Sequence, residues 1–173
     1  ASGGCTDQFG TRYWPGGKAP DGKKVTIAAG DDGGSSDKLR LGVANERTSD
    51  IRPGLLKELY DTGVAFTEWC NEQGGIAGRK VELVTEDTES NPATGARKLR
   101  SLVQRNNASF IVGSVHSGVM LSSIPVATEL KTVYFSSGEA TEATGEKGTR
   151  YSFRTGTDTY GLAAAGAPWA FEN

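Results

Sequence analysis

The chain has 173 residues, of which 36% are hydrophobic and 24 are glycine, and its formal net charge is −2. This length predicts one domain with a sizeable core, and the lack of a basic surplus argues against a nucleic-acid-binding protein. The sequence contains no apolar run of about 18 residues that could form a transmembrane helix. Residues 1–10 lack the charged start and apolar core of a signal peptide.

Residues 1–37 are predicted to be a flexible N-terminal tail or linker, because glycine, serine, proline and aspartate are dense there. Cys5 follows the small residues of a lipoprotein cleavage site, although Ser2 stands where leucine is usual. One interpretation is that Cys5 carries a lipid that anchors the chain to a membrane. The other is a free or disulfide-bonded cysteine in an exported tail. The second cysteine, Cys70, is expected to be a buried, inert thiol.

The ordered part is predicted to begin with a short strand at Leu39–Val43 and a helix over residues 54–73. Residues at helical spacing would give this helix one apolar face, which contains Leu55, Leu59, Thr62 or Gly63, Phe66, and Trp69 or Cys70. Glycines 74 and 75 can close the helix, and Gly78 allows a second reversal into a strand at residues 80–85. So tight a turn from helix to strand is typical of a βαβ unit.

The same unit is repeated along the rest of the chain. Asn91 and Pro92 suit the N-cap and the first position of a second helix. Its buried face is expected to contain Ala93, Ala96, Leu99, Leu102 and Val103. Further strands are predicted at residues 109–113, 132–135 and 151–155, with a helix ending near residue 130 and another beginning near residue 159.

Prolines interrupt the last two predicted helices. Pro125 implies a kink or a late start of the helix that ends near residue 130, and Pro168 should bend the final helix or end it early. The alternation of strands and helices predicts an α/β fold, a doubly wound parallel sheet in a three-layer αβα arrangement. The expected strand order is 2-1-3-4, with the fifth strand at or near the crossover.

Ligands bind beyond the carboxyl ends of the strands in such sheets. This rule selects the loops at residues 45–50, 114–118, 136–139 and 155–160. Within the second loop, Ser114, Ser117 and Gly118 precede a helix N-terminus, whose free backbone N–H groups and dipole favour an anion. Alternatively, Ser117 is only the N-cap of that helix.

The sequence gives little support to an enzyme. His116 is the only histidine, and its neighbour Ser117 cannot easily face it as a nucleophile. No G-x-S-x-G motif is present, and Val119 and Met120 stand where a P-loop needs lysine and serine or threonine. With one histidine and no cysteine pair at ligand spacing, a zinc site is not expected. We therefore expect no catalytic residue, metal or cofactor, and expect His116 to line the cleft or simply to pack.

Several segments together resemble a known family. They are Ala65–Lys80, Glu86–Pro92, Phe110–Ser114 with Ser117 and Gly118, Pro125–Ala127 and Tyr151–Thr155. In this order they resemble the first lobe of the type I periplasmic binding protein family, in the group of ABC-importer proteins that bind branched-chain amino acids, amides and urea. The resemblance covers about residues 39–173. Residues 51–54, 58–62 and 69–71 resemble an actinobacterial branch.

The resemblance implies a solute-binding protein that is exported to the periplasm or the cell surface. Two lobes would close on a small polar solute and deliver it to the permease subunits of an ABC transporter. The expected ligand-binding residues are Ser114, His116, Ser117, Gly118, Ser136, Ser137, Gly138, Glu139 and Tyr160. Glu139 stands where relatives carry a hydroxyl, and its carboxylate would repel a carboxylate ligand. A cationic, amide or polyol solute is therefore favoured.

The resemblance also implies a division of the chain. Residues 38–157 would form the first lobe, and residues 158–173 the crossover and the first helix of a second lobe that is missing. The alternative is a single-lobe surface protein that docks a protein partner on the face where the second lobe would lie. An exposed apolar patch around Trp169 and Phe171 would favour a missing lobe or partner.

Overall fold

The structure is a computed structural model and describes residues 38–49, 55–76 and 78–172. The predictions for residues 1–37, including the lipid on Cys5, lie outside this part. The elements are β1 (Lys38–Asn45), α2 (Leu55–Glu72), β2 (Lys80–Asp87), α3 (Pro92–Gln104), β3 (Phe110–Val112), α4 (Ser117–Glu129), β4 (Tyr134–Ser136), the 3-10 turn η1 (Thr141–Ala143), β5 (Ser152–Arg154) and α5 (Thr159–Glu172).

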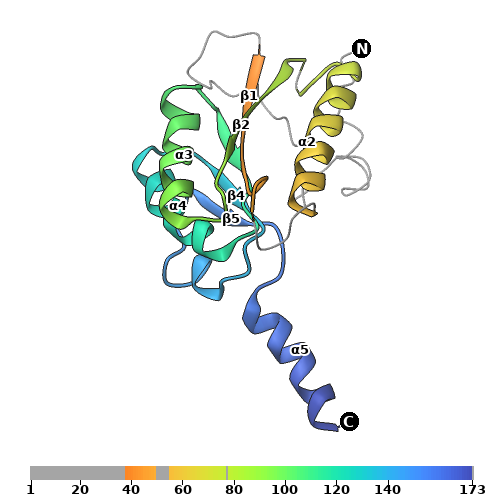
Figure 1. Cartoon of the computed structure of the whole chain (residues 1–173), viewed down its shortest axis with the longest axis vertical. Helices are drawn as coiled ribbons and strands as arrows, with labels where there is room; N and C mark the ends of the chain where they lie inside the picture. The colour runs from red at the N-terminus through yellow and green to blue at the C-terminus, as the bar shows by residue number, and fades with distance from the viewer. Residues whose placement is uncertain (1–37, 50–54, 77, 173) are drawn as a thin grey trace, which may run out of the picture.

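The five strands form one parallel sheet in the order β2-β1-β3-β4-β5. Leu41 of β1 pairs with Leu83 of β2 in parallel register, so the predicted strand order and direction are confirmed. Helices α3 and α4 cover one face of the sheet, and α2 lies on the other (Figure 1). The α/β class and the three-layer arrangement are therefore confirmed as well.

The main core lies between the sheet and helices α3 and α4. Leu99, Leu102, Ile111, Met120 and Tyr134 are all 0% exposed. The prediction for α3 is right for Leu99 and Leu102 but wrong for Ala93, which is exposed. Gly95 is buried instead, because its lack of a side chain lets α3 approach Val119 of α4. The predicted cap is present, since the Asn91 side chain accepts a hydrogen bond from the Thr94 amide.

Helix α2 contacts the sheet mainly through its last turns. Cys70 and Val81 form a small second cluster, and the Asn71 side chain bonds both the backbone N–H and the carbonyl of Val81, at 2.7 and 2.8 Å. The predicted apolar face is wrong at Leu59 and Phe66, which are 50% and 42% exposed, because the earlier turns do not reach the sheet. Cys70 is buried as expected, but it is disulfide-bonded, so the expectation of a thiol is wrong.

Both prolines are accommodated within helices. Helix α4 runs through Pro125, and α5 runs through Pro168 to Glu172, so neither a late start nor an early end occurs. Both prolines are exposed, and water can therefore bond the carbonyl groups that they leave unpaired. Helix α5 projects away from the sheet (Figure 1), and none of its described residues is buried. Among the described helices, none is long and apolar enough to cross a membrane.

Candidate functional site

A hollow lies at the carboxyl edge of the sheet, between the strand ends and α2. Its volume is about 210 Å³. The residues that line it are Val43, Asn45, Glu46, Leu59, Val112, Gly113, Ser114, Val115, Phe135, Ser136, Ser137 and Thr155. Three of the nine predicted ligand-binding residues, Ser114, Ser136 and Ser137, are among them. The other six are not.

The floor of the hollow is apolar. Val43 pairs with Val112, and Val112 pairs with Phe135, so these three side chains point to the same face of the sheet. Phe153 continues the line on β5, where its ring lies 5.4 Å from that of Phe135. We call these four residues the apolar row. It is only partly covered, because Val112 and Phe153 are 38% and 45% exposed.

The hydroxyls of Ser114 and Ser136 brace the strand ends. Ser136 Oγ donates to the Ser114 carbonyl at 2.7 Å and accepts the Gly138 amide at 3.1 Å. Ser114 Oγ donates to the His116 carbonyl at 3.1 Å. Both serines are 1% exposed. These two predicted residues therefore shape the wall of the hollow through bonds within the protein, while Ser137 is exposed beside them.

Glu46 is a residue of the hollow that the sequence analysis did not single out. It is 1% exposed, and its carboxylate oxygens accept the backbone amides of Val115 and His116 at 3.3 and 3.4 Å. These amides belong to the loop that was expected to bind an anionic part of a solute. The protein therefore places a carboxylate of its own there. The sequence feature that could have identified Glu46 is its position directly after a strand, at the carboxyl edge of the sheet.

His116 caps α4. Its Nδ1 atom accepts the Val119 amide at 3.3 Å, and Ser117 is the first residue of the helix. The interpretation of Ser117 as the N-cap is therefore wrong, because the His116 ring accepts the hydrogen bond of the free Val119 amide. Gly118 lies against the His116 ring and Gly138 against Met120, and a Cβ atom at either glycine would come within 2.9 Å of these side chains. Both glycines thus permit close packing.

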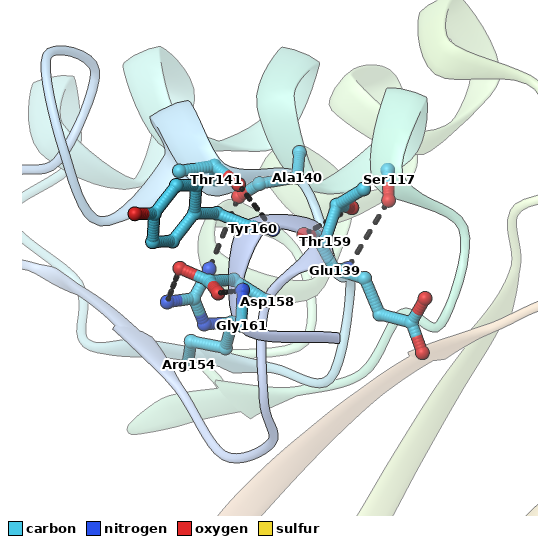
Figure 2. Close-up of polar contacts among 9 residues, drawn as sticks. All are labelled: Ser117, Glu139, Ala140, Thr141, Arg154, Asp158, Thr159, Tyr160 and Gly161. Carbon is cyan, nitrogen blue, oxygen red and sulfur yellow. Dashed lines mark hydrogen bonds and ion pairs between the residues drawn. The ribbon is translucent and has the colours of Figure 1, made fainter. Parts of the chain in front are cut away.

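Figure 2 shows how the loop after β4 is joined to the start of α5. The amide and the hydroxyl of Thr159 both donate to the Glu139 carbonyl at 2.8 Å, and the Tyr160 amide donates to Thr141 Oγ1 at 3.1 Å. The Glu139 amide in turn donates to Ser117 Oγ at 3.1 Å. The Glu139 carboxylate points away from these contacts (Figure 2). Ser117, Glu139 and Tyr160 are thus brought together, outside the lining of the hollow.

An ion pair fixes the same junction. Arg154 Nη2 lies 3.1 Å from Asp158 Oδ2, and their side chains are 13% and 22% exposed. Arg154 also donates to the Ala140 carbonyl at 3.2 Å, and Asp158 Oδ1 accepts the Gly161 amide at 2.6 Å, as an N-cap does. This ion pair was not predicted from the sequence. The sequence feature that could have identified it is an aspartate directly before a helix and four residues after an arginine.

Within the ranges that the structure describes, no group of three or more histidine, cysteine, aspartate or glutamate side chains is arranged to hold a metal ion. Tyr134, beneath the strand ends, is fully buried and its OH accepts the Ser114 amide at 3.3 Å. Burial raises the pKa of the Tyr134 phenol, so this group stays neutral and structural.

Known structures resemble this lobe. A branched-chain amino acid ABC transporter protein from Rhodopseudomonas palustris is 28% identical to this chain, with a TM-score of 0.60. The match covers 69% of this chain and 33% of the Rhodopseudomonas chain. A periplasmic binding protein from Burkholderia mallei is 28% identical with a TM-score of 0.61, over 73% and 34%. A leucine-binding protein from Thermotoga maritima, at 23% identity and a TM-score of 0.68 over 78% and 37%, shows the fold alone.

The chain thus spans about one third of the length of these structures. A comparison with curated proteins finds no match. The family model described as "Periplasmic binding protein" matches residues 38–173, which include every described strand and helix. The chain therefore belongs to the periplasmic binding protein family.

Proposed function

We propose that this chain is one lobe of an extracytoplasmic solute-binding protein that captures a small polar solute for an ABC importer. The observation that carries the proposal is a partly apolar hollow at the carboxyl edge of a periplasmic-binding-protein lobe. Ligands bind at this edge in open α/β sheets. The Rhodopseudomonas palustris relative, described as an ABC-type branched-chain amino acid transporter, supports a role in import rather than in catalysis.

The solute would meet two kinds of surface. Its apolar part would lie on Val43, Val112 and Phe135, which line the hollow. Its polar part would meet Ser117, whose oxygen already accepts the Glu139 amide; the Ser117 proton remains available to donate to a solute oxygen. The predicted contacts at His116, Gly118, Gly138 and Tyr160 would then act mainly by positioning the loops that carry Ser117 and Glu139.

Two acidic side chains would select the solute. Glu46 lines the hollow and is buried, whereas Glu139 is exposed in the loop after β4, outside that lining. Because like charges repel most strongly where water is excluded, a free carboxylate would bind poorly near buried Glu46, and exposed Glu139 would add a weaker repulsion. An amide, polyol or cationic end is favoured. This extends the sequence-based interpretation of Glu139 to a second residue.

We further propose that residues 38–157 act as the first lobe and residues 158–173 lead into a second. The Arg154–Asp158 pair and the bonds of Thr159 support this division, because they fix the direction in which α5 leaves the lobe. Exposed Trp169 and Phe171 would then pack in the second lobe. Permease subunits as partners belong to the same proposal.

Calorimetric titration tests this function. The 173-residue chain, and a form lengthened to carry a second lobe, are titrated with L-leucine, L-leucinamide, L-lysine and D-glucose. We expect the lengthened form to bind one of these at least tenfold more tightly than the 173-residue chain, because the contacts of the second lobe are otherwise absent. If the lengthened form binds none, and the 173-residue chain instead forms a stable complex with a protein partner, the single-lobe alternative is supported.

A further inference from the structure

Asn45 is a buried amide without a hydrogen-bond partner. It is 8% exposed and lines the hollow at the end of β1. Neither Oδ1 nor Nδ2 has a hydrogen-bond partner within the described part of the chain. The Asn45 main chain is paired, since its carbonyl accepts the Thr88 amide at 2.8 Å. The unpaired groups therefore belong to the side chain alone.

Such a side chain needs an explanation. Most buried polar side-chain atoms in proteins are hydrogen-bonded, because an unpaired donor or acceptor loses its water without compensation. An asparagine offers two donors and an acceptor, so the loss is larger than for a single hydroxyl. An apolar residue at this position would avoid it. Because Asn45 lines the hollow, its unpaired carboxamide is placed where a bound solute could become its hydrogen-bond partner.

Side chains alternate along a strand, so Asn45 points to the same face of β1 as Val43. Both residues line the hollow, and Val43 belongs to its apolar floor. The Asn45 carboxamide is therefore a neutral polar group set at the end of an apolar surface. Glu46 adds an acidic group beside it, which is already bonded to the amides of Val115 and His116.

We propose that Asn45 is a specificity-determining solute contact, which binds a neutral solute group that offers both a donor and an acceptor, such as a carboxamide or an alcohol. The inference rests on the proposed function, and it adds Asn45 to the residues that bind the solute. Both polar atoms of Asn45 are covered in the present conformation, so contact with a solute requires a change of rotamer at this side chain. The carboxamide bonds the solute directly, and Glu46 excludes carboxylates from the same place.

Thr88 provides a matched control. Its Oγ1 atom is also buried and without a partner among the described residues, at 0% exposure, but Thr88 does not line the hollow. Thr88→Val removes a buried unpaired hydroxyl and keeps the shape. Asn45→Leu removes the unpaired amide and keeps the branching, and Asn45→Ala removes it without adding bulk.

The first measurement is urea unfolding of the 173-residue chain without solute. We expect Asn45→Leu or Asn45→Ala to unfold at a urea concentration equal to or above that of the wild type, as Thr88→Val does, because no bond is lost. If both Asn45 variants unfold at a clearly lower concentration, the amide is bonded within the solute-free protein, for example by a buried water. That result overturns the inference.

The second measurement is titration of the lengthened form with L-leucinamide and L-leucine. We expect the wild type to prefer L-leucinamide. In Asn45→Leu the affinity for L-leucinamide falls about tenfold or more and the preference shrinks, while Thr88→Val binds as the wild type does. Unchanged binding by both Asn45 variants overturns the inference and leaves the proposed function intact. A wild type that binds none of the four probes contradicts the proposed function, and this inference with it.

Discussion

The hydroxyl of Ser117 accepts a hydrogen bond from the backbone amide of Glu139, with an oxygen–nitrogen distance of 3.1 Å (Figure 2). This bond joins the first turn of α4 to the loop after β4. Two segments that lie 22 positions apart in the sequence therefore hold each other in place. Because the bond uses only a lone pair of the Ser117 oxygen, the hydroxyl proton can still be donated to a solute.

Ser117→Ala is expected to weaken solute binding about fivefold or more. The reason is the loss of a donor to the solute, which contributes about 1 kcal/mol, together with a looser Glu139 loop. Calorimetry of the lengthened form measures the change. Ser109→Ala is the control, because Ser109 is exposed and precedes β3 at the opposite edge of the sheet. If the Ser117 and Ser109 variants bind the solute with equal affinity, the polar part of the solute does not contact Ser117.

Substitutions of Asp158 separate its two roles. Asp158→Ala removes both the ion pair with Arg154 and the bond to the Gly161 amide, whereas Asp158→Asn keeps an acceptor for that amide. Loss of an N-cap costs about 1 kcal/mol, so amides of α5 should exchange with solvent faster in Asp158→Ala than in Asp158→Asn. Hydrogen exchange resolved to α5 measures this. Identical exchange in both variants would show that the cap does not hold the helix.

Two glycines test the packing of α3 on α4. A Cβ atom at Gly95 would lie 2.5 Å from Val119 Cγ1, whereas one at Gly63 of α2 meets nothing within 4 Å. Gly63→Ala should stabilise the fold by about 0.5–1 kcal/mol through helix propensity. Gly95→Ala gains the same propensity but overpacks the core, which costs about 1–3 kcal/mol. We expect urea unfolding to show a net loss for Gly95→Ala. A gain at both positions would mean that α3 and α4 separate easily.

The Arg100–Glu129 pair gives a pH-dependent prediction. Both Nη atoms of Arg100 donate to the Glu129 carboxylate, at 2.8 and 2.6 Å. The hydrogen bond to Arg100 is the main cause that lowers the pKa of Glu129 below its ordinary value of 4.5. The contribution to stability is therefore present above that value, and it is lost as the pH falls through the lowered pKa in the folded chain.

Glu129→Gln should accordingly lower the urea midpoint slightly at neutral pH, and the difference from the wild type should vanish at an acid pH below the lowered pKa of Glu129. The effect is small because the pair is exposed to solvent, and added salt should reduce it further at neutral pH. Urea titrations at both pH values and at two salt concentrations measure it. A difference that persists in acid would assign the effect to packing of the side chain.

The fold was predictable because its signals are local. Glycines 74, 75 and 78 have positive φ values of 98°, 77° and 78°, as the turn between α2 and β2 required, and the pattern of apolar residues located each strand. The side of α2 that faces the sheet was not predictable from such signals. Leu59 and Phe66 have the spacing of a buried face, but the helix meets the sheet only near Cys70.

The candidate site was predictable as an edge of the sheet but not residue by residue. The strand predicted to end at Val43 continues to Asn45. Those two extra residues place the Asn45 side chain on the face of the hollow, which no local pattern indicated. The burial of Glu46 depends on the amides of Val115 and His116, about 70 positions further along the chain. Sequence spacing carries no information on such a contact.

The apolar row has a consequence for handling the chain in solution. Phe153, Val112, Val115 and Leu59 each expose between 38% and 50% of their surface on or beside it, and contiguous apolar surface of this kind is rare on soluble monomers. The association of such surfaces is driven by entropy near room temperature and weakens on cooling. The isolated chain should therefore self-associate as it is concentrated or warmed, and stay monomeric longest in the cold.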